Sequence, residues 1–258
     1  MLRGMDPGQQ LSEVQRLVQL LHGDGVRPLS GVLHCVSSLR AADGRLHVIK
    51  INEHAPRSAT DFFVLNLARA SADAIVTSAQ VVRAEPQLSH ELQGPLAQGL
   101  LRYRREVLGK LEPPTSAILT RSAQLPAAHR VFRDRMQTLV LTEPEQAPAL
   151  AQQLQAAGAQ VLGVPALDLR VAVALLLQRG ARSVLVEAGP SLASQLYDPP
   201  ACVQHLWLSR YDGALDVRAL GGALPAESLL LSGMRCVSEH VVQEPSGPWR
   251  FQDWQRSD

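Results

Sequence analysis

The residues best suited to bind a charged ligand follow a short apolar run in the segment SVLVEAGPSLASQLY, which begins at Ser183. Glu187 comes at the end of a predicted strand, and Gly189 allows the backbone to turn tightly and to lie close to a ligand. Pro190 favours the first turn of a helix, where its missing N–H costs nothing. Free amides at the start of that helix, which the Ser191 hydroxyl can also satisfy, attract an anion. A nearby carboxylate can hold an amide or amino group of a heterocycle. The segment therefore suggests a nucleotide phosphate beside a polar ring, with a purely structural turn as the alternative.

Two arginines are further candidates because each could bind a phosphate group. Arg69 ends a predicted helix just before a predicted strand at 74–77, and its guanidinium could reach a phosphate. The alternative is a solvated arginine that the helix dipole favours at this position. Arg121 follows a predicted strand at 116–119 and could bind a ribose phosphate, as arginine does in sites that prefer the phosphorylated dinucleotide. An arginine on a surface loop is the alternative there.

The motifs of several other classes of enzyme and binding site are absent from this sequence. It contains no GxSxG nucleophile motif, no GxxxxGK[ST] phosphate loop and no GxGxxG fingerprint. The eight histidines form no HExxH pair or other ligand spacing, so we expect no metal site. His205 lies in an apolar run and is better explained as a packed core residue than as a catalyst.

The bulk properties narrow the class of protein. With 258 residues, of which 46% are hydrophobic, the chain can bury one large core or two small ones. A formal net charge of +1 argues against a nucleic-acid-binding surface. No apolar run reaches membrane-spanning length, and the start of the sequence lacks the basic-then-apolar pattern of a signal peptide. The three cysteines are odd in number and far apart, which predicts reduced thiols and a cytoplasmic location.

Apolar runs of strand length alternate with helical patterns through the middle of the chain. Strands are predicted at 31–37, 46–51, 74–77, 116–119, 138–141, 160–164 and 183–186, and helices at 9–22, 58–70, 144–157 and 168–179. Such βα units predict an α/β fold with a mainly parallel sheet flanked by helices. The runs at 205–209 and 236–242 have no helix between them, so we expect them to add antiparallel edge strands and to make the sheet mixed. The stretch 89–110 is predicted to be a loop with a short helix over 100–108.

Three segments, in this order, resemble the reductase domain of bacterial riboflavin biosynthesis, which is the C-terminal part of RibD-type proteins. They are ATDFFVLNLARASADAIVTSAQVVRAEPQL, TSAILTRSAQLP and GARSVLVEAGPSLASQLY. The resemblance is colinear over roughly residues 30–240, and the order and spacing of the pieces carry it. It implies a dihydrofolate-reductase-like fold. We accordingly divide the chain into an N-terminal helical extension (1–27), a reductase domain (28–245) and a C-terminal tail (246–258).

The resemblance implies an NADPH-dependent reduction of a phosphorylated ribosylamino-pyrimidine to its ribitylamino form. A hydride from the nicotinamide would add to C1 of the sugar in its ring-opened imine form. The small-molecule substrate would be bound by Arg69, Glu187 and Leu88, with Glu187 also the catalytic candidate. The cofactor would be bound by Ser37, Val81, Arg121, Ser122, Gly189, Pro190, Ser191, Leu192, Ala193 and Ser194. The family also implies a homodimer, with no nucleic-acid or membrane partner.

Departures from the family pattern fall at positions that would face a ligand. Val81 stands in place of a threonine, Glu85 in place of a pair of acids, and Ala188 in place of the first glycine of the turn. The zinc-binding HxE…PCxxC set of the family's deaminase half is absent. The alternative hypothesis is therefore a homologue that binds a nucleotide or has a structural role without catalysis. An unrelated α/β transferase is the third.

Overall fold

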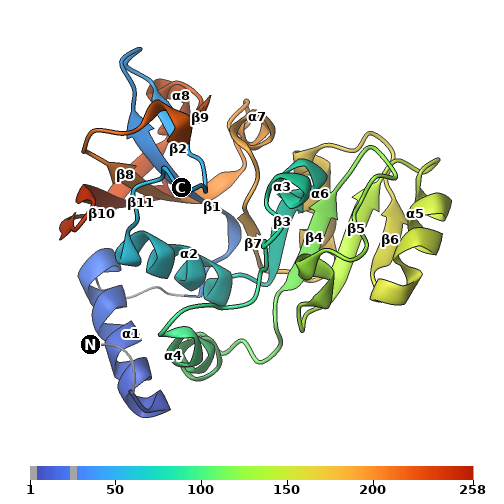
Figure 1. Cartoon of the computed structure of the whole chain (residues 1–258), viewed down its shortest axis with the longest axis horizontal. Helices are drawn as coiled ribbons and strands as arrows, with labels where there is room; N and C mark the ends of the chain where they lie inside the picture. The colour runs from blue at the N-terminus through green and yellow to red at the C-terminus, as the bar shows by residue number, and fades with distance from the viewer. Residues whose placement is uncertain (1–4, 24–27, 258) are drawn as a thin grey trace.

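A computed structural model describes residues 5–23 and 28–257. Within these residues the chain forms an eleven-stranded sheet in the order β10-β11-β8-β1-β7-β3-β4-β5-β6, with β2 paired to β1 and β9 paired to β2 (Figure 1). The strands are β1 (Gly31–Arg40), β2 (Leu46–Ile49), β3 (Ala74–Ser78), β4 (Thr115–Leu119), β5 (Thr138–Thr142), β6 (Gln160–Gly163), β7 (Ser183–Val186), β8 (Val203–Tyr211), β9 (Leu220–Ala223), β10 (Met234–Glu244) and β11 (Gly247–Arg256). The helices are α1 (Pro7–His22), α2 (Ala59–Ser71), α3 (Ala79–Ala84), α4 (Ala97–Arg102), α5 (Ala147–Leu154), α6 (Leu169–Gln178), α7 (Pro190–Ala193) and α8 (Glu227–Leu230).

The strands from β8 to β6 in this order run parallel to one another. Every residue of β5 and of β7 is buried, as expected for parallel strands with helices on both faces. The predicted fold class, a mixed and mainly parallel α/β sheet flanked by helices, is therefore confirmed. Because β7 lies between β1 and β3, although it follows β6 in the chain, the carboxyl ends of β7, β3 and β4 meet at one edge of the sheet.

The last strands agree with the prediction only in part, since β10 is the expected antiparallel edge strand and β8 is not. β8 is not an antiparallel edge strand, because it pairs in parallel with β1. Its other side is covered by β11 in antiparallel pairing, and β10 forms the edge. β11 lies within 246–258, the segment that the sequence analysis described as a tail. Trp249, Phe251 and Asp253 are buried there while the residues between them are partly exposed, so the alternation of a strand is present in the sequence.

Polar caps explain where the long helices begin. The Ser58 hydroxyl accepts a hydrogen bond from the Asp61 amide at 2.9 Å at the start of α2. The Asp168 carboxylate accepts one from the Val171 amide at 2.7 Å at the start of α6. Such caps satisfy amides that have no partner within the helix. The region between β3 and β4 is less regular: α3 follows β3 directly, and α4 continues into a π-helical turn at Tyr103–Val107.

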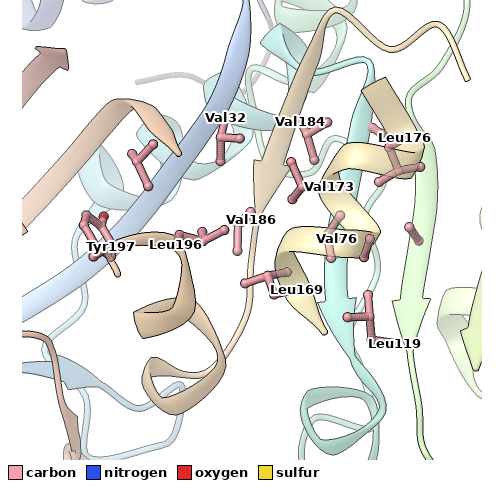
Figure 2. Packing of buried hydrophobic residues seen from close by; sticks show 14 of the residues in the cluster. Val32, Val76, Leu119, Leu169, Val173, Leu176, Val184, Val186, Leu196 and Tyr197 are labelled. Carbon is pink, nitrogen blue, oxygen red and sulfur yellow. The ribbon is translucent and has the colours of Figure 1, made fainter. Parts of the chain in front are cut away.

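Helices cover both faces of the sheet. α1, α2 and α4 pack over one face, where Leu185 of β7 joins their core (Figure 1). α6 covers the other face, and α3 and α5 pack against β4 and β5. In Figure 2 the side chains of α6 point toward the sheet. Those of α6 are Leu169, Val173 and Leu176, and they face Val184 and Val186 of β7 and Val76 of β3.

Candidate functional site

A cleft of about 660 Å³ opens at the carboxyl ends of β3, β4 and β7. In an open α/β sheet this is the usual place for a ligand, and the volume is typical of cofactor and small-molecule sites. One side of the cleft is formed by α3 and the loop after β4, and another by the turn after β7. The strands β2 and β9 contribute Val48, Gly221 and Gly222.

The turn after β7 brings unpaired backbone amides to this cleft. Gly189, Pro190, Ser191 and Leu192 line it. Among the described residues, the amides of Ala188, Gly189 and Ser191 have no hydrogen-bond acceptor. α7 begins here without a side-chain cap, so the serines of this segment do not satisfy those amides. Unpaired N–H groups at a helix start favour an anion.

Gly189 is not needed for the turn itself. Its φ of −59° and ψ of 156° are accessible to any residue, so the interpretation that glycine permits a tight turn is wrong here. A Cβ built on Gly189 would meet no atom within 4 Å. The backbone therefore has open space beside it, which a ligand can approach.

Charged side chains of both signs line the cleft. Lys50, Arg83 and Arg121 are the cations, and Glu85 and Asp168 are the acids. Asp168 is committed to the cap of α6. Arg121 is 69% exposed and donates one hydrogen bond, from Nη2 to the carbonyl oxygen of residue 167 at 3.0 Å. The lining thus carries an excess of positive charge, which favours an anionic ligand.

The fold brings Arg69 and Glu187 together as an ion pair. Neither residue lines the cleft. Arg69 Nε and Nη2 donate to the two carboxylate oxygens of Glu187, each at 2.7 Å. The two side chains are 6% and 11% exposed. Burial alone raises the pKa of Glu187, but the charge and hydrogen bonds of Arg69 outweigh it and hold that pKa below its ordinary value. Each side chain keeps lone pairs or N–H groups beyond this bidentate contact.

The remaining predicted residues fall into two groups. Val81, Arg121 and Ser122 line the cleft together with the turn residues named above. The others do not line it. Ser37 Oγ donates to both oxygens of Asp61 at 2.7 and 2.8 Å. The rest are held in the fold: Leu88 lies in a hydrophobic core, Ala193 is buried, and Ser194 Oγ donates to the Ser191 carbonyl at 2.9 Å.

Sequence reasoning missed the contribution of β2 and β9. Lys50 follows β2 and lines the cleft. A Cβ on Gly221 would lie 2.4 Å from Val48 Cγ2, so glycine lets β9 pack closely on β2. The Gly-Gly pair at 221–222 was a usable signal for close backbone packing. Nothing local predicted that this pair of strands would reach the turn after β7.

A second pocket, of about 590 Å³, lies at the opposite, amino ends of the strands. Its buried charged side chains have hydrogen-bond partners within the fold. Lys110 Nζ donates to Asp73, whose other carboxylate oxygen accepts from the Ser183 amide at 3.0 Å. Arg104 donates only to carbonyl oxygens, those of Ala70 and Ala72 among them. We therefore regard the carboxyl-end cleft as the candidate site.

The parts of the chain that the structure describes contain no cluster of His, Cys, Asp and Glu able to hold a metal ion. In the same residues no helix is long and apolar enough to cross a membrane.

Several solved structures are similar to this chain in fold. A pyrimidine reductase-like protein from Corynebacterium diphtheriae is similar with a TM-score of 0.63 at 20% identity, covering 94% of this chain and 99% of that chain. RibD of Acinetobacter baumannii gives 0.61 at 17% identity, covering 90% of this chain and 59% of that longer chain. A riboflavin biosynthesis reductase of Saccharomyces cerevisiae gives 0.55 at 15% identity, covering 94% and 99%. At these identities the likeness shows the fold, and it confirms the expected dihydrofolate-reductase-like architecture.

The sequence itself identifies the family. No protein of curated function matches it. The model of the RibD C-terminal domain matches residues 35–201, which include the turn after β7 and the strands β3 and β4. Because this match spans more than half of the chain, the protein belongs to the RibD C-terminal domain family.

Proposed function

We propose that this chain is an NADPH-dependent reductase of a phosphorylated ribosylamino-pyrimidine, of the kind that acts in riboflavin biosynthesis. The family supports a pyrimidine reductase-like activity, and the names of the similar structures agree with it. The observation that carries the proposal is the cleft at the carboxyl ends of β3, β4 and β7, with unpaired amides on one side and cations around it.

The residues present fit a phosphorylated dinucleotide. The amides of Gly189 and Ser191 would hold its pyrophosphate, and the open space beside Gly189 admits it. Arg121 is mostly exposed. Its contacts are the Leu167 carbonyl and a long ion pair with Glu143, whose Oε1 lies 3.9 Å from Arg121 Nε. It would bind the 2′-phosphate, with Ser122 beside it. Val81 would pack against the ligand from α3. When bound, NADPH supplies a hydride, and the chain's task is to position the acceptor carbon next to it.

We assign the substrate to the inner side of the cleft, toward Arg69 and Glu187. The carboxylate lone pairs left free by the bidentate contact can accept N–H groups of a pyrimidine, and the remaining N–H groups of Arg69 can donate to an oxygen. Ser37 and Leu88 are the further positions that the family implies. Glu187 would then orient the substrate, while Arg69 keeps the carboxylate of Glu187 ionised.

One observation favours the second candidate, a homologue that binds the nucleotide without catalysis. Arg69 and Glu187 already satisfy each other and are nearly buried, so a substrate must reach them through their outer edges. If the substrate has no access to the inner side of the cleft, the chain can bind the cofactor without catalysing the reduction.

We further propose a homodimer in the cytoplasm. The dimer rests on the family alone, and light scattering of the purified chain tests it. The free Cys35, Cys202 and Cys236 support a reducing compartment.

Fluorescence titration with NADPH and NADH, followed by turnover of 5-amino-6-(5-phosphoribosylamino)uracil, tests the proposed activity. We expect NADPH to bind more tightly than NADH and the compound to be reduced. Binding without turnover supports the second candidate. Absence of NADPH binding contradicts both.

A further inference from the structure

Glu85 is an acid of the cleft that the fold itself does not use. It caps the carboxyl end of α3 through its backbone amide, which donates to the Val81 carbonyl at 2.9 Å. Its own carbonyl oxygen contacts His129 Nε2 at 3.0 Å, so the backbone is held from two sides. The side chain lines the cleft and is half-buried. Its carboxylate makes no hydrogen bond or ion pair within the described residues.

The charges around Glu85 favour its protonated form. Burial is the main cause that raises its pKa, and the carboxylate of Glu187 at the end of β7 adds to it. Arg69 on α2 opposes the rise. Because Arg69 and Glu187 form an ion pair, their effects on Glu85 oppose each other, and burial remains the main cause of the raised pKa. Arg83, in the last turn of α3, donates instead to the Gln124 carbonyl at 3.0 Å. His129, on the other side, contacts the backbone of Glu85 and not its carboxylate.

The other acids near the cleft are committed elsewhere. Glu187 is ionised and held by Arg69. Asp168 accepts the Val171 amide as the cap of α6. Glu85 is therefore the carboxyl group in the lining that can exchange a proton with a bound ligand without breaking a contact of the fold.

We propose that Glu85 is the proton donor of the reduction, and this rests on the proposed function. The acceptor is a C=N bond, which becomes a C–N single bond. Its carbon gains the hydrogen and two electrons that NADPH supplies, and its nitrogen gains the proton of the Glu85 carboxyl group. The N–H bond forms as the O–H bond of Glu85 breaks, and water then returns a proton to the carboxylate. General acid catalysis of this kind contributes roughly 100-fold or more to a rate.

The variant Glu85→Gln tests this, because glutamine keeps the shape of the side chain but cannot donate an acid proton. We expect kcat with 5-amino-6-(5-phosphoribosylamino)uracil to fall about 100-fold, while the Kd for NADPH changes by less than about threefold, since Glu85 holds no phosphate. Glu145→Gln, at an exposed acid outside the lining, is the matched control and should change neither. The wild-type kcat should fall as pH rises through the pKa of Glu85, and this limb should be missing in Glu85→Gln.

A readout independent of turnover is the titration of Glu85 by carbon-13 NMR of labelled glutamate carboxyl groups, with the resonance assigned by its loss in Glu85→Gln. A pKa above the ordinary value of 4.5 supports the proposal. An ordinary pKa, or a variant that keeps wild-type kcat, overturns the role of Glu85 while leaving the reductase intact. If the wild-type chain binds no NADPH, or binds it without reducing the compound, the proposed function itself fails and the donor role falls with it.

Discussion

Arg69 and Glu187 each have the chemistry of a ligand-binding residue, but in the fold they form a buried ion pair. Taken one at a time along the chain, they are an arginine that could bind a phosphate and an acid that could bind a ring. In the fold they lie 2.7 Å apart in a bidentate contact and are almost wholly buried. A buried pair contributes little net stability, but removing one partner leaves the other charge unpaired. We therefore expect a variant that removes only one of the two charges to destabilise the protein.

Glu187→Gln should lower the free energy of unfolding by about 3 kcal/mol, because it leaves the guanidinium of Arg69 buried without a counter-charge. The double variant Arg69→Met with Glu187→Leu should lose less than the single variant, since both charges are then gone. Denaturant titration measures both. Glu13→Gln, which breaks an exposed pair with Arg16, is the control and should cost under about 1 kcal/mol.

A double variant that is less stable than Glu187→Gln would show that the pair is not coupled in this way. In folded Glu187→Gln protein, NADPH binding should stay nearly intact while turnover falls. Equal loss of both would remove Glu187 from the substrate side.

Burial holds the pKa of His34 at about 4, against an ordinary value of 6.5. Between these two values the unfolded chain binds a proton on His34 that the folded chain does not, so the free energy of unfolding falls as pH decreases through this window. The expected loss from this residue is about 2 kcal/mol between pH 6.5 and pH 5. Unfolding of the wild type and of His34→Gln at pH 7, 6 and 5 measures it. The two stabilities should converge as pH falls, and a constant difference would show that His34 protonates normally in the fold.

Arg121→Ala should weaken NADPH binding about tenfold and NADH binding much less, because only NADPH carries the phosphate that this cation would pair with. Titration of both cofactors gives the ratio. Arg179→Ala, at an exposed arginine beside the other pocket, is the matched control. An unchanged ratio in Arg121→Ala would remove this residue from the phosphate site.

At the scale of elements, the N-terminal helix α1 is part of the main core. Val14, Val18 and Leu21 are buried in the same cluster as residues of α2 and α4. α4 approaches α1 so closely that a Cβ on Gly99 would lie 2.6 Å from the Gln10 carbonyl oxygen. The contact between these helices therefore depends on a glycine within a helix.

Gly99→Ala should destabilise the chain by about 1–3 kcal/mol, because the clash is with backbone and exceeds the gain of roughly 1 kcal/mol in helix propensity. Thermal or denaturant unfolding measures this. Gly189→Ala is the matched control, since a Cβ there meets no atom within 4 Å, and its stability should not fall. A stable Gly99→Ala protein would mean that α1 can shift on α4 at no cost.

The elements predicted well from sequence are those whose pattern is local. Most of the βα units from 58 to 186 were found, because buried strands are continuous apolar runs and each long helix has an amphipathic repeat. α3 was missed because its six residues are too few to show a helical period. β8 was assigned the wrong direction because it pairs in parallel with β1, a strand far before it in the chain. It was wrongly placed at the edge because β11, which follows it by more than thirty residues, covers its other side.

At the scale of the whole molecule, the candidate site was only partly predictable. The turn at 189–192 and Arg121 could be found because they directly follow predicted strands, and topology then brought those strand ends together. Lys50 could not be found, because it reaches the cleft through the pairing of β2 with β9. The glycine pair at 221–222 gave a signal in the sequence, but nothing local showed that it would lie beside the turn after β7. The mutual neutralisation of Arg69 and Glu187 was likewise missed, since residues 118 apart in sequence give no local sign of contact.

The most direct test is a crystal structure of the chain with NADP⁺ bound. We predict the pyrophosphate at the amides of Gly189 and Ser191 and the 2′-phosphate within hydrogen-bond distance of Arg121, with the nicotinamide on the side of Glu85. A dinucleotide in the pocket around Lys110, or a cleft that stays empty at saturating NADP⁺, would contradict the account.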